Sequence, residues 1–375
     1  MKIVCDNKIP FLRGVFEPYA EVVYLPGGET TAAVVRDADA VVTRTRTRCD
    51  AALLAGSAVR VVATATIGYD HIDTAWCEAH GILWRNAPGC NSRSVQQYVG
   101  AALCALARRH GLQLEGMTLG VVGVGNVGAK VAQTGAALGM RVLLCDPPRA
   151  RREGPDGFVS LDEIISRSDI VTLHVPLSRE GEDATWHLFD AARLAAMRPD
   201  QLLINSSRGP VVDNAALKAA LAAKALRGAV LDVWEEEPAP DSGLLDLVDI
   251  ATPHIAGYSA DGKAAGTAAA VQTVAARLGL PLTGWRPSGI PAPAQPLSFA
   301  LDAAGKPLQE VLSQALLYTY DILADDRALR AHPECFEQLR GDYPVRREPA
   351  AFVVRLRGGA DAAARLRALG FRVEE

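Results

Sequence analysis

The chain of 375 residues is 49% hydrophobic and 22% charged, which supplies cores for two or three domains and excludes a largely disordered protein. Its 39 basic and 43 acidic residues give a net charge of −4, and this excludes the basic excess typical of a dedicated nucleic-acid-binding protein. No apolar run approaches the roughly 18 residues of a membrane span, and no apolar signal segment follows Met1.

The cysteines and histidines show neither a metal-site pattern nor a disulfide framework. The seven cysteines are scattered and never form a Cys-x-x-Cys pair, and the seven histidines lack the spacing of metal ligands. We therefore expect no bound metal and no disulfide bonds. We also expect a cytoplasmic protein without nucleic-acid or membrane partners.

Short runs of β-branched residues alternate with helical segments along most of the chain. The first set of predicted strands comprises residues 2–5, 22–25, 40–43, 59–63 and 82–84. The second set comprises residues 119–124, 142–145, 170–174, 202–206, 229–233 and 250–252, between long helices over 92–109 and 259–278. Most of these strands are apolar on both faces and are separated by helices. They predict an α/β fold with two doubly wound parallel sheets.

The composition changes near the C-terminus. Five prolines between Pro281 and Pro296 indicate a linker. Beyond the linker we predict a helix over 308–323, charged turns, a strand over 351–357, a helix over 360–369 and a short final strand. These elements predict a small α+β domain at the C-terminus.

A glycine motif follows the first strand of the second set. Gly123, Gly125 and Gly128 form a Gly-x-Gly-x-x-Gly motif between that strand and a helix, and Asp146 follows the next strand. The glycines permit a tight turn, close approach of backbone N–H groups to a pyrophosphate, and close packing of helix on strand. Asp146 can accept hydrogen bonds from a ribose and would repel a 2′-phosphate, although arginines follow it. The motif therefore predicts a Rossmann-like lobe that prefers NAD to NADP.

Three ionisable residues follow three strands of the same set: Arg208, Glu237 and His254. The carboxyl ends of parallel strands meet at one edge of a sheet, where ligands bind. Each residue alone is as easily a solvated loop charge as a functional group. Together, and beyond a dinucleotide motif, they indicate an active site.

In motif, order and spacing, residues 1–285 resemble the D-isomer-specific 2-hydroxyacid dehydrogenase family, whose catalytic residues are Arg, Glu and His in this chain order. The resemblance implies that Arg208 binds the substrate carboxylate and that His254 accepts the hydroxyl proton while a hydride leaves C2 for NAD. Glu237 stands directly before a proline, as in the family motif, and would orient and stabilise His254. The implied layout is a substrate lobe over 1–95, completed by about 257–285, an NAD-binding Rossmann domain over 96–256, and a C-terminal domain over 286–375.

Arginine and threonine alternate over residues 43–48. On an extended strand end this period of two would place Arg44, Arg46 and Arg48 on one face. Three guanidinium groups suit a phosphorylated substrate, and an exposed, solvated edge explains them equally well.

Within the family, the motifs over 63–71, 87–91, 120–128, 145–149 and 254–258 resemble the branch that oxidises 4-phospho-D-erythronate with NAD on the route to pyridoxal 5′-phosphate. That branch carries a C-terminal dimerisation domain, so the resemblance implies a homodimer through residues 286–375. The implied substrate contacts are Thr45, Thr66 and Tyr258, with Arg44 and Arg46 as candidates for the phosphate. The implied cofactor contacts, besides the glycines, are Asn126, Val127, Asp146, Pro176, Ser206, Ser207, Arg208, Asp232 and Gly257.

Two alternatives stay open at this stage. The first is another enzyme of the family, such as a 3-phosphoglycerate dehydrogenase or a glyoxylate reductase, because the catalytic Arg, Glu and His are shared. The second is a non-catalytic NAD-sensing protein like the corepressors that use the same fold.

Overall fold

The computed structural model describes all 375 residues, and their contacts divide the chain into two compact units. The first unit comprises Met1–Asn91 and Ser259–Pro291, and the second comprises Ser92–Tyr258 and Ala292–Glu375. The C-terminal residues thus cluster with the middle of the chain, and the three predicted domain boundaries stay predictions. No helix of either unit combines the length and the apolar character needed to cross a bilayer.

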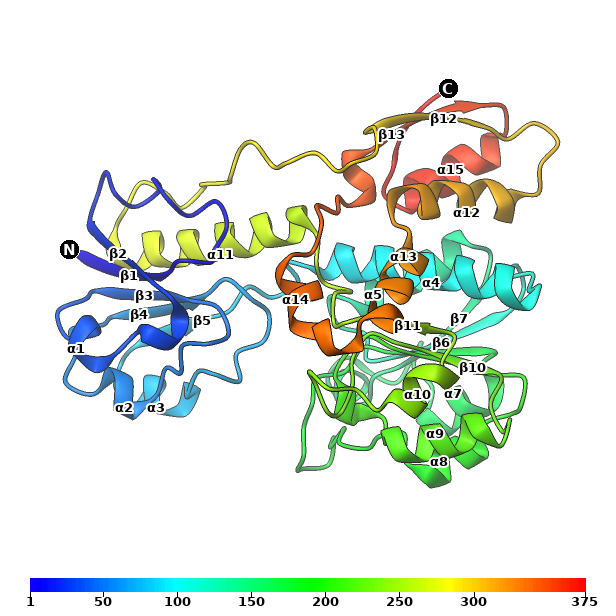
Figure 1. Ribbon diagram of the computed structural model, residues 1–375, viewed down its shortest axis with the longest axis horizontal. Helices are drawn as coiled ribbons and strands as arrows, with labels where there is room; N and C mark the ends of the chain where they lie inside the picture. Colours follow the sequence, from blue (N-terminus) through cyan, green and yellow to red (C-terminus); the bar gives the residue numbers. More distant parts are fainter. The chain divides into compact units, whose positions relative to one another are not determined.

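The first unit is built on a five-stranded parallel sheet with the order β2-β1-β3-β4-β5. Its strands are β1 (Lys2–Asp6), β2 (Glu21–Leu25), β3 (Ala40–Thr43), β4 (Val61–Thr64) and β5 (Leu83–Arg85). Its helices are α1 (Ala32–Val35), α2 (Ala51–Leu54), α3 (Thr74–Ala79) and α11 (Ala260–Leu278). Figure 1 shows α11 along one face of the sheet and the three short helices on the other. A separate apolar cluster fills each face, as expected for a doubly wound sheet.

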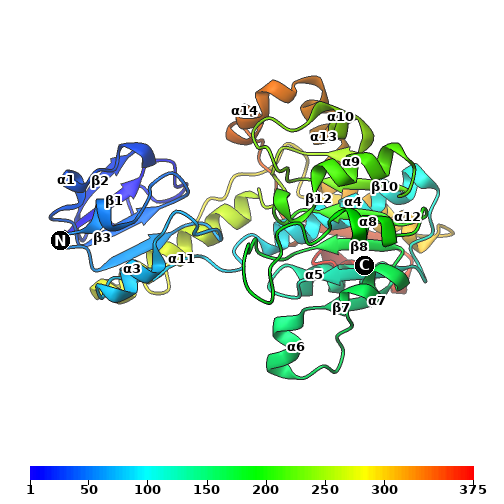
Figure 2. The same cartoon turned by 90° about the horizontal axis from the view of Figure 1, so that it is seen from below.

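The second unit contains a six-stranded parallel sheet with the order β11-β10-β9-β8-β6-β7. Its strands are β6 (Thr118–Val122), β7 (Arg141–Cys145), β8 (Ile170–Leu173), β9 (Leu202–Asn205), β10 (Gly228–Leu231) and β11 (Ile250–Ala251). The surrounding helices are α4 (Ser92–His110), α5 (Gly128–Ala137), α6 (Pro147–Glu153), α7 (Leu161–Arg167), α8 (Ala191–Ala196), α9 (Asn214–Ala222) and α10 (Ser242–Leu247). The strand order reverses between β6 and β8, so the ligand crevice of such a sheet opens at their carboxyl ends. Figure 2 shows α6 projecting beyond β7 at this edge.

The C-terminal residues add a second layer over α4 and α5. A three-stranded parallel sheet has the order β12-β13-β14, formed by β12 (Ser298–Asp302), β13 (Val353–Arg357) and β14 (Arg372–Glu374). The helices are α12 (Leu308–Thr319), α13 (Ile322–Ala331), α14 (Phe336–Gly341) and α15 (Ala360–Ala368). Helix α12 packs on α4, α15 packs on α5, and α13 contacts both α4 and β11. One apolar cluster runs from α4 into these helices without interruption, so the C-terminal layer shares the core of the Rossmann-like sheet.

The prediction of two doubly wound sheets followed by an α+β segment is confirmed, with most strands within two residues of their predicted bounds. The single helix predicted over 308–323 is wrong, because α12 ends at Thr319 and Asp321 accepts the backbone N–H groups of Leu323 and Ala324 as the cap of α13. The predicted charged turns contain α13 and α14. Single-turn 3-10 helices lie at Gly27–Glu29 (η1), Gly209–Val211 (η2), Pro333–Cys335 (η3) and Pro349–Ala351 (η4).

Candidate active site

His254 and Glu237 form a hydrogen-bonded pair beyond the carboxyl ends of β11 and β10, which are neighbours in the sheet. The Nδ1 atom of His254 lies 2.7 Å from Oε2 of Glu237. The other carboxylate oxygen of Glu237 accepts the backbone N–H of Trp234 at 3.0 Å. Both side chains are partly exposed, at 32% for His254 and 22% for Glu237. Because Nδ1 is engaged by the carboxylate, the Nε2 atom is the one that can meet a ligand.

The loop that carries His254 is held by a buried carboxylate. Asp232 accepts the backbone N–H groups of Ile255 and Ala256 at 2.8 and 2.9 Å and the hydroxyl of Thr252 at 2.6 Å. His254 itself has a φ of +55°, in the left-handed region that few residues other than glycine adopt. Its backbone N–H donates to the carbonyl of Asp232 at 2.7 Å, so the surrounding contacts impose this conformation. Asp232, which the sequence analysis predicts as a cofactor contact, holds the loop that carries His254.

The environments of Glu237 and Asp232 shift their pKa values in opposite directions. Burial alone would raise the pKa of Glu237, but the hydrogen bond and charge of His254, the N–H of Trp234 and the guanidinium of Arg340 together lower it. Burial raises the pKa of Asp232, against the opposing effects of His254, Thr252 and two backbone N–H groups. Of these two carboxylates, the one that contacts His254 is thus the one whose pKa is lowered.

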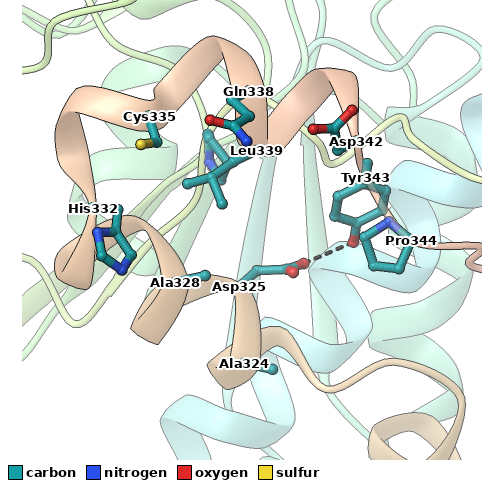
Figure 3. A pocket seen from close by; sticks show the side chains of 11 residues that line it. Ala324, Asp325, Ala328, His332, Cys335, Gln338, Leu339, Asp342, Tyr343 and Pro344 are labelled. Carbon is teal, nitrogen blue, oxygen red and sulfur yellow. Dashed lines mark hydrogen bonds between the residues drawn. The ribbon is translucent and has the colours of Figure 1, made fainter.

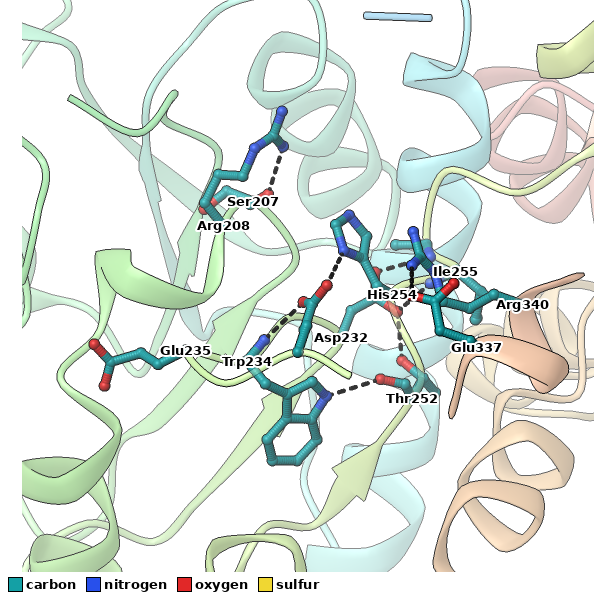
Figure 4. A network of polar contacts seen from close by, with 12 residues as sticks. Ser207, Arg208, Asp232, Trp234, Glu235, Thr252, His254, Ile255, Glu337 and Arg340 are labelled. Atoms are coloured by element: carbon teal, nitrogen blue, oxygen red, sulfur yellow. Dashed lines mark hydrogen bonds and ion pairs between the residues drawn. The ribbon is translucent and has the colours of Figure 1, made fainter. Parts of the chain in front are cut away.

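Arg208 follows β9, the strand next to β10 in the sheet. Its Nη1 atom donates to the carbonyl of Ser207 at 2.8 Å, and Asn205 fastens the turn by donating to the carbonyl of Arg208 at 3.0 Å. Figure 4 shows the guanidinium of Arg208 extended from this turn, with His254 on the neighbouring loop. The three predicted catalytic residues therefore come from three adjacent strand ends of one sheet. In the structure, the direct contact among them is the one between His254 and Glu237.

Gly125 of the glycine motif lines a cavity of about 650 Å³ at the carboxyl ends of β6 and β7. Gly123 has a φ of +85°, and a Cβ atom on Gly128 would collide with the carbonyl oxygen of Gly123. A Cβ on Gly125 would meet no atom within 4 Å, so the backbone there faces open space. Asp146 accepts the backbone N–H groups of Val124 and Arg149 at 2.8 and 3.0 Å. The cavity is lined by Arg93, Val124, Gly125, Asn126, Ala129, Lys130, Gln133, Asp146, Arg149 and Arg152.

These residues fit a dinucleotide. Helix α5 begins after Val127 without a side-chain cap, and the positive end of its dipole favours a pyrophosphate there. The Oγ atom of Ser206, beyond β9, is buried without a hydrogen-bond partner, as expected of a group that awaits a ligand. The predicted cofactor residue Pro176 follows β8, and its carbonyl accepts the hydroxyl of Thr185 at 2.6 Å. Ser207 is buried and donates to Asn205, and Gly257 lies on the His254 loop.

The predicted phosphate ligands belong to the first unit. Strand β3 ends at Thr43, so residues 44–48 form a bent segment, and the expected extended strand end with three arginines on one face is wrong. Arg44 donates to the carbonyl of Lys8 at 3.2 Å, and the largely exposed Arg48 pairs with Asp50 at 2.8 Å. Thr45 and Arg46 are exposed. The hydroxyl of Thr66 donates to the carbonyl of Gly68 at 2.9 Å.

Two arginines of the C-terminal segment reach the His254 loop and are not among the residues predicted from the sequence. Arg346, only 4% exposed, donates through Nη2 to the carbonyls of Ile255 and Ala256 at 3.2 and 2.6 Å. Arg340 lies near Tyr258 and acts electrostatically on Glu237. The sequence signal was weak: a cluster of arginines near Tyr343, in a segment without regular periodicity.

A second cavity, of about 420 Å³, lies behind the loop and is lined almost entirely by residues of the C-terminal segment, together with Pro253. Figure 3 shows Asp325 and Tyr343 facing each other in this cavity. The carboxylate of Asp325 accepts the hydroxyls of Tyr343 and Tyr320 at 2.7 and 2.8 Å. Burial raises the pKa of Asp325, and the guanidinium of Arg346 opposes that rise.

A third polar cluster lies near Glu235. His187, Asp213 and Glu235 place potential metal-ligand atoms within 4.8 Å of one another. His187 Nε2 is 2.6 Å from Oε1 of Glu235, whose other oxygen accepts the N–H of Asn214. Figure 4 shows Glu235 pointing away from His254, so this residue does not join the catalytic pair.

Two family models match this chain, one in each of the two segments that form the second unit. Residues 84–256 match the family model described as D-isomer specific 2-hydroxyacid dehydrogenase, NAD binding domain, and residues 294–370 match a model described as a domain of unknown function. The chain is 48% identical over 353 residues to an erythronate-4-phosphate dehydrogenase of Bacteroides fragilis, covering 94% of this chain and 98% of the relative. It is 46% identical over 381 residues to the protein of the same name from Pseudomonas syringae, covering 99% of each.

Solved structures share the fold over a smaller part of the chain. A D-lactate dehydrogenase of Aquifex aeolicus complexed with NAD and lactic acid is 26% identical with a TM-score of 0.62, covering 74% of this chain and 96% of that one. An NAD-dependent formate dehydrogenase of Staphylococcus aureus in complex with NAD is 25% identical with a TM-score of 0.57, covering 72% and 93%.

The lowered pKa of Glu237 predicts a pH-dependent stability difference. A carboxylate with a lowered pKa in the folded state stabilises that state above its unfolded pKa and loses this contribution as the pH falls through its folded pKa. Glu237→Gln is therefore expected to lower the free energy of unfolding at pH 7 by about 1.5–3 kcal/mol, as for a hydrogen bond to a charged group. The difference from wild type should shrink as the pH falls below the usual glutamate range. Urea unfolding at several pH values measures this, with the exposed neighbour Glu236→Gln as control. An equal deficit at every pH would contradict the prediction.

Proposed function

Because this chain belongs to the D-isomer-specific 2-hydroxyacid dehydrogenase family, and within it to the erythronate-4-phosphate dehydrogenases, we propose that it oxidises 4-phospho-D-erythronate to (R)-3-hydroxy-2-oxo-4-phosphobutanoate. The reaction serves the synthesis of pyridoxal 5′-phosphate. The observation that carries a dehydrogenase function is the His254–Glu237 pair at 2.7 Å, placed beside the strand that leads to Arg208. A non-catalytic NAD sensor would not need a histidine paired in this way.

The cofactor is NAD, because residues 84–256 match the NAD-binding domain of the family. When bound, NAD accepts the hydride that leaves C2 of the substrate. The chain would hold it through the N–H groups at the start of α5 and through Asp146 at the adenosine ribose. The remaining proposed contacts are Gly123, Gly125, Asn126, Val127, Gly128, Pro176, Ser206, Ser207, Arg208, Asp232 and Gly257.

The chain's own catalytic groups handle the proton and the carboxylate. We assign Nε2 of His254 as the atom that accepts the proton of the C2 hydroxyl, because Nδ1 is already bound to Glu237. Glu237 keeps the ring in one orientation and stabilises the imidazolium that forms, and its lowered pKa supports this role. Arg208 offers a planar pair of N–H donors that matches the substrate carboxylate.

The phosphorylated part of the substrate needs further contacts. We assign Thr45, Thr66 and Tyr258 to the substrate, with Arg44 and Arg46 as candidates for the phosphate. The bent segment over 44–48 exposes Thr45 and Arg46, and this supports their availability to a ligand. The alternative within the family is another phosphorylated hydroxy acid, such as 3-phosphoglycerate.

The substrate assignment is tested by comparing two phosphorylated acids. Purified protein with NAD is expected to form NADH with a kcat/KM for 4-phosphoerythronate at least about 10-fold above that for 3-phosphoglycerate, a ratio that corresponds to about 1.4 kcal/mol of transition-state binding. The absorbance of NADH measures both rates, and coupled removal of the keto acid prevents reversal. A preference for 3-phosphoglycerate would overturn the assignment. No turnover of any 2-hydroxy acid would favour the sensor.

The proton acceptor is tested by His254→Ala, which should lower kcat by a factor of about 10²–10⁴ because general base catalysis is lost. NADH binding, followed by fluorescence, should persist. His332→Ala, which removes a largely exposed histidine, is the matched control and should retain wild-type turnover. Wild-type kcat in His254→Ala would remove His254 from the mechanism.

We further propose that the protein is a cytoplasmic homodimer that associates through residues 286–375. Residues 294–370 match a family model of their own, and the chain aligns with a relative over 99% of each protein, so this segment is included in the alignment. The resemblance described in the sequence analysis implies a dimerisation domain in this segment, and the match supports the proposal. The chain has a mass of 39.7 kDa, so sedimentation equilibrium should give about twice this value. A single species at the mass of one chain would contradict it.

A further inference from the structure

Arg340 is a partly buried cation of the C-terminal segment whose hydrogen-bonding capacity is incompletely used. It lies in the short helix α14, and its side chain is 20% exposed. Nη1 pairs with Glu337 at 2.9 Å, while the buried Nε atom has no hydrogen-bond partner. A buried guanidinium N–H without a partner costs free energy unless a ligand or water satisfies it.

The groups around Arg340 belong to the proposed substrate site. Its guanidinium carbon is 5.9 Å from the ring centroid of Tyr258, with which it also interacts through a side-chain hydrogen bond. Its charge acts on the carboxylate of Glu237, the partner of His254. Figure 4 shows Arg340 entering this network from α14, on the side of the His254 loop opposite to Arg208. Arg208 and Arg340 thus lie on opposite sides of His254 in the view of Figure 4.

The solved neighbours match only part of this chain although they align over almost all of their own length. The lactate and formate dehydrogenases align over 93–96% of their own length but cover only 72–74% of this chain. Residues 294–370 match a family model separate from that of the NAD-binding domain, and Arg340 lies within them. Lactate and formate carry one anionic group, whereas a phosphorylated hydroxy acid carries two. An added cation next to an otherwise shared site matches this added charge.

We propose that Arg340 binds the second anionic group of the substrate, its phosphate, and that the C-terminal segment thereby sets selectivity for phosphorylated over unphosphorylated hydroxy acids. The inference rests on the proposed function and adds a specificity-determining residue to it. A guanidinium presents parallel N–H donors that match two phosphate oxygens, and such charge-assisted bonds are stronger than neutral ones. Arg208 would hold the carboxylate at the reacting end, and Arg340 the other end.

A purely electrostatic role is the main competing explanation. Arg340 helps to lower the pKa of Glu237. If that were its whole role, its removal would slow the oxidation of every substrate equally, because Glu237 serves the proton transfer and not the recognition of phosphate. The two explanations therefore differ in substrate dependence.

The test compares Arg340→Met and Arg340→Lys with wild type on 4-phosphoerythronate and on erythronate, the same acid without phosphate. In Arg340→Met we expect kcat/KM for 4-phosphoerythronate to fall by about 10- to 100-fold, the loss typical of a charge-assisted hydrogen bond, and the value for erythronate to change by less than about 3-fold. Arg340→Lys should retain part of the kcat/KM that Arg340→Met loses, because lysine keeps the positive charge but lacks the parallel N–H donors of the guanidinium. Equal losses for both acids, or no loss for either, would overturn the proposal.

Inorganic phosphate provides a second measurement that does not depend on the slow erythronate reaction. We expect it to inhibit wild type in competition with 4-phosphoerythronate and to inhibit Arg340→Met at least about 10-fold more weakly. Unchanged inhibition would count against the proposal. Arg327→Met, which removes an exposed cation of α13 paired with Asp321, is the control and should leave both measurements unchanged.

If wild type fails to oxidise 4-phosphoerythronate, the proposed function fails. If wild type is active and Arg340→Met keeps its selectivity, only this inference fails.

Discussion

The geometry of the site depends on two buried side chains of opposite charge that hold one loop. Asp232 accepts the N–H groups of Ile255 and Ala256, and Arg346 donates to the carbonyls of the same two residues. Buried backbone groups must be paired, and here two charged side chains pair them in place of regular secondary structure. The loop can therefore keep His254 at a φ of +55°, where its ring meets Glu237. Without either charge, polar backbone groups next to His254 would lose their partners.

These two charges come from distant parts of the chain, so the C-terminal segment helps to hold the His254 loop. Asp232 follows β10 of the Rossmann-like sheet, whereas Arg346 lies between α14 and β13. Arg346 is packed 4.4 Å from the ring of Tyr320, and the neighbouring Gln97 of α4 donates to the carbonyl of Arg347 at 3.0 Å. The segment is thus fastened to α4 and to the loop by the same short stretch.

Much of the fold could be predicted from the sequence, because local patterns determine it, and two of the three residues predicted as catalytic, Glu237 and His254, are in contact in the structure. Buried parallel strands are short apolar runs, and the glycine motif and the Arg–Glu–His order each carry a definite chemical requirement. The failures have physical causes as well. A capping aspartate inside an apolar-periodic run divides the predicted helix over 308–323, and the alternating arginines of residues 44–48 leave the strand after Thr43. The role of Arg346 was not predicted, because its partners are backbone carbonyls about 90 residues away. A contact of this kind leaves no periodic pattern in the sequence.

The acidic groups around the loop differ in the direction in which their surroundings shift their pKa values. Asp232 and Asp325 are both enclosed, and burial raises the pKa of each although hydroxyl or N–H donors surround them. Glu237 is also partly buried, but an imidazole, a backbone N–H and the charge of Arg340 act on it together, and its pKa is lowered. Neighbouring carboxylates whose pKa values are shifted in opposite directions typically have different roles. The carboxylate whose pKa is lowered is the one that contacts His254. The structural carboxylates use their oxygens to hold the loop.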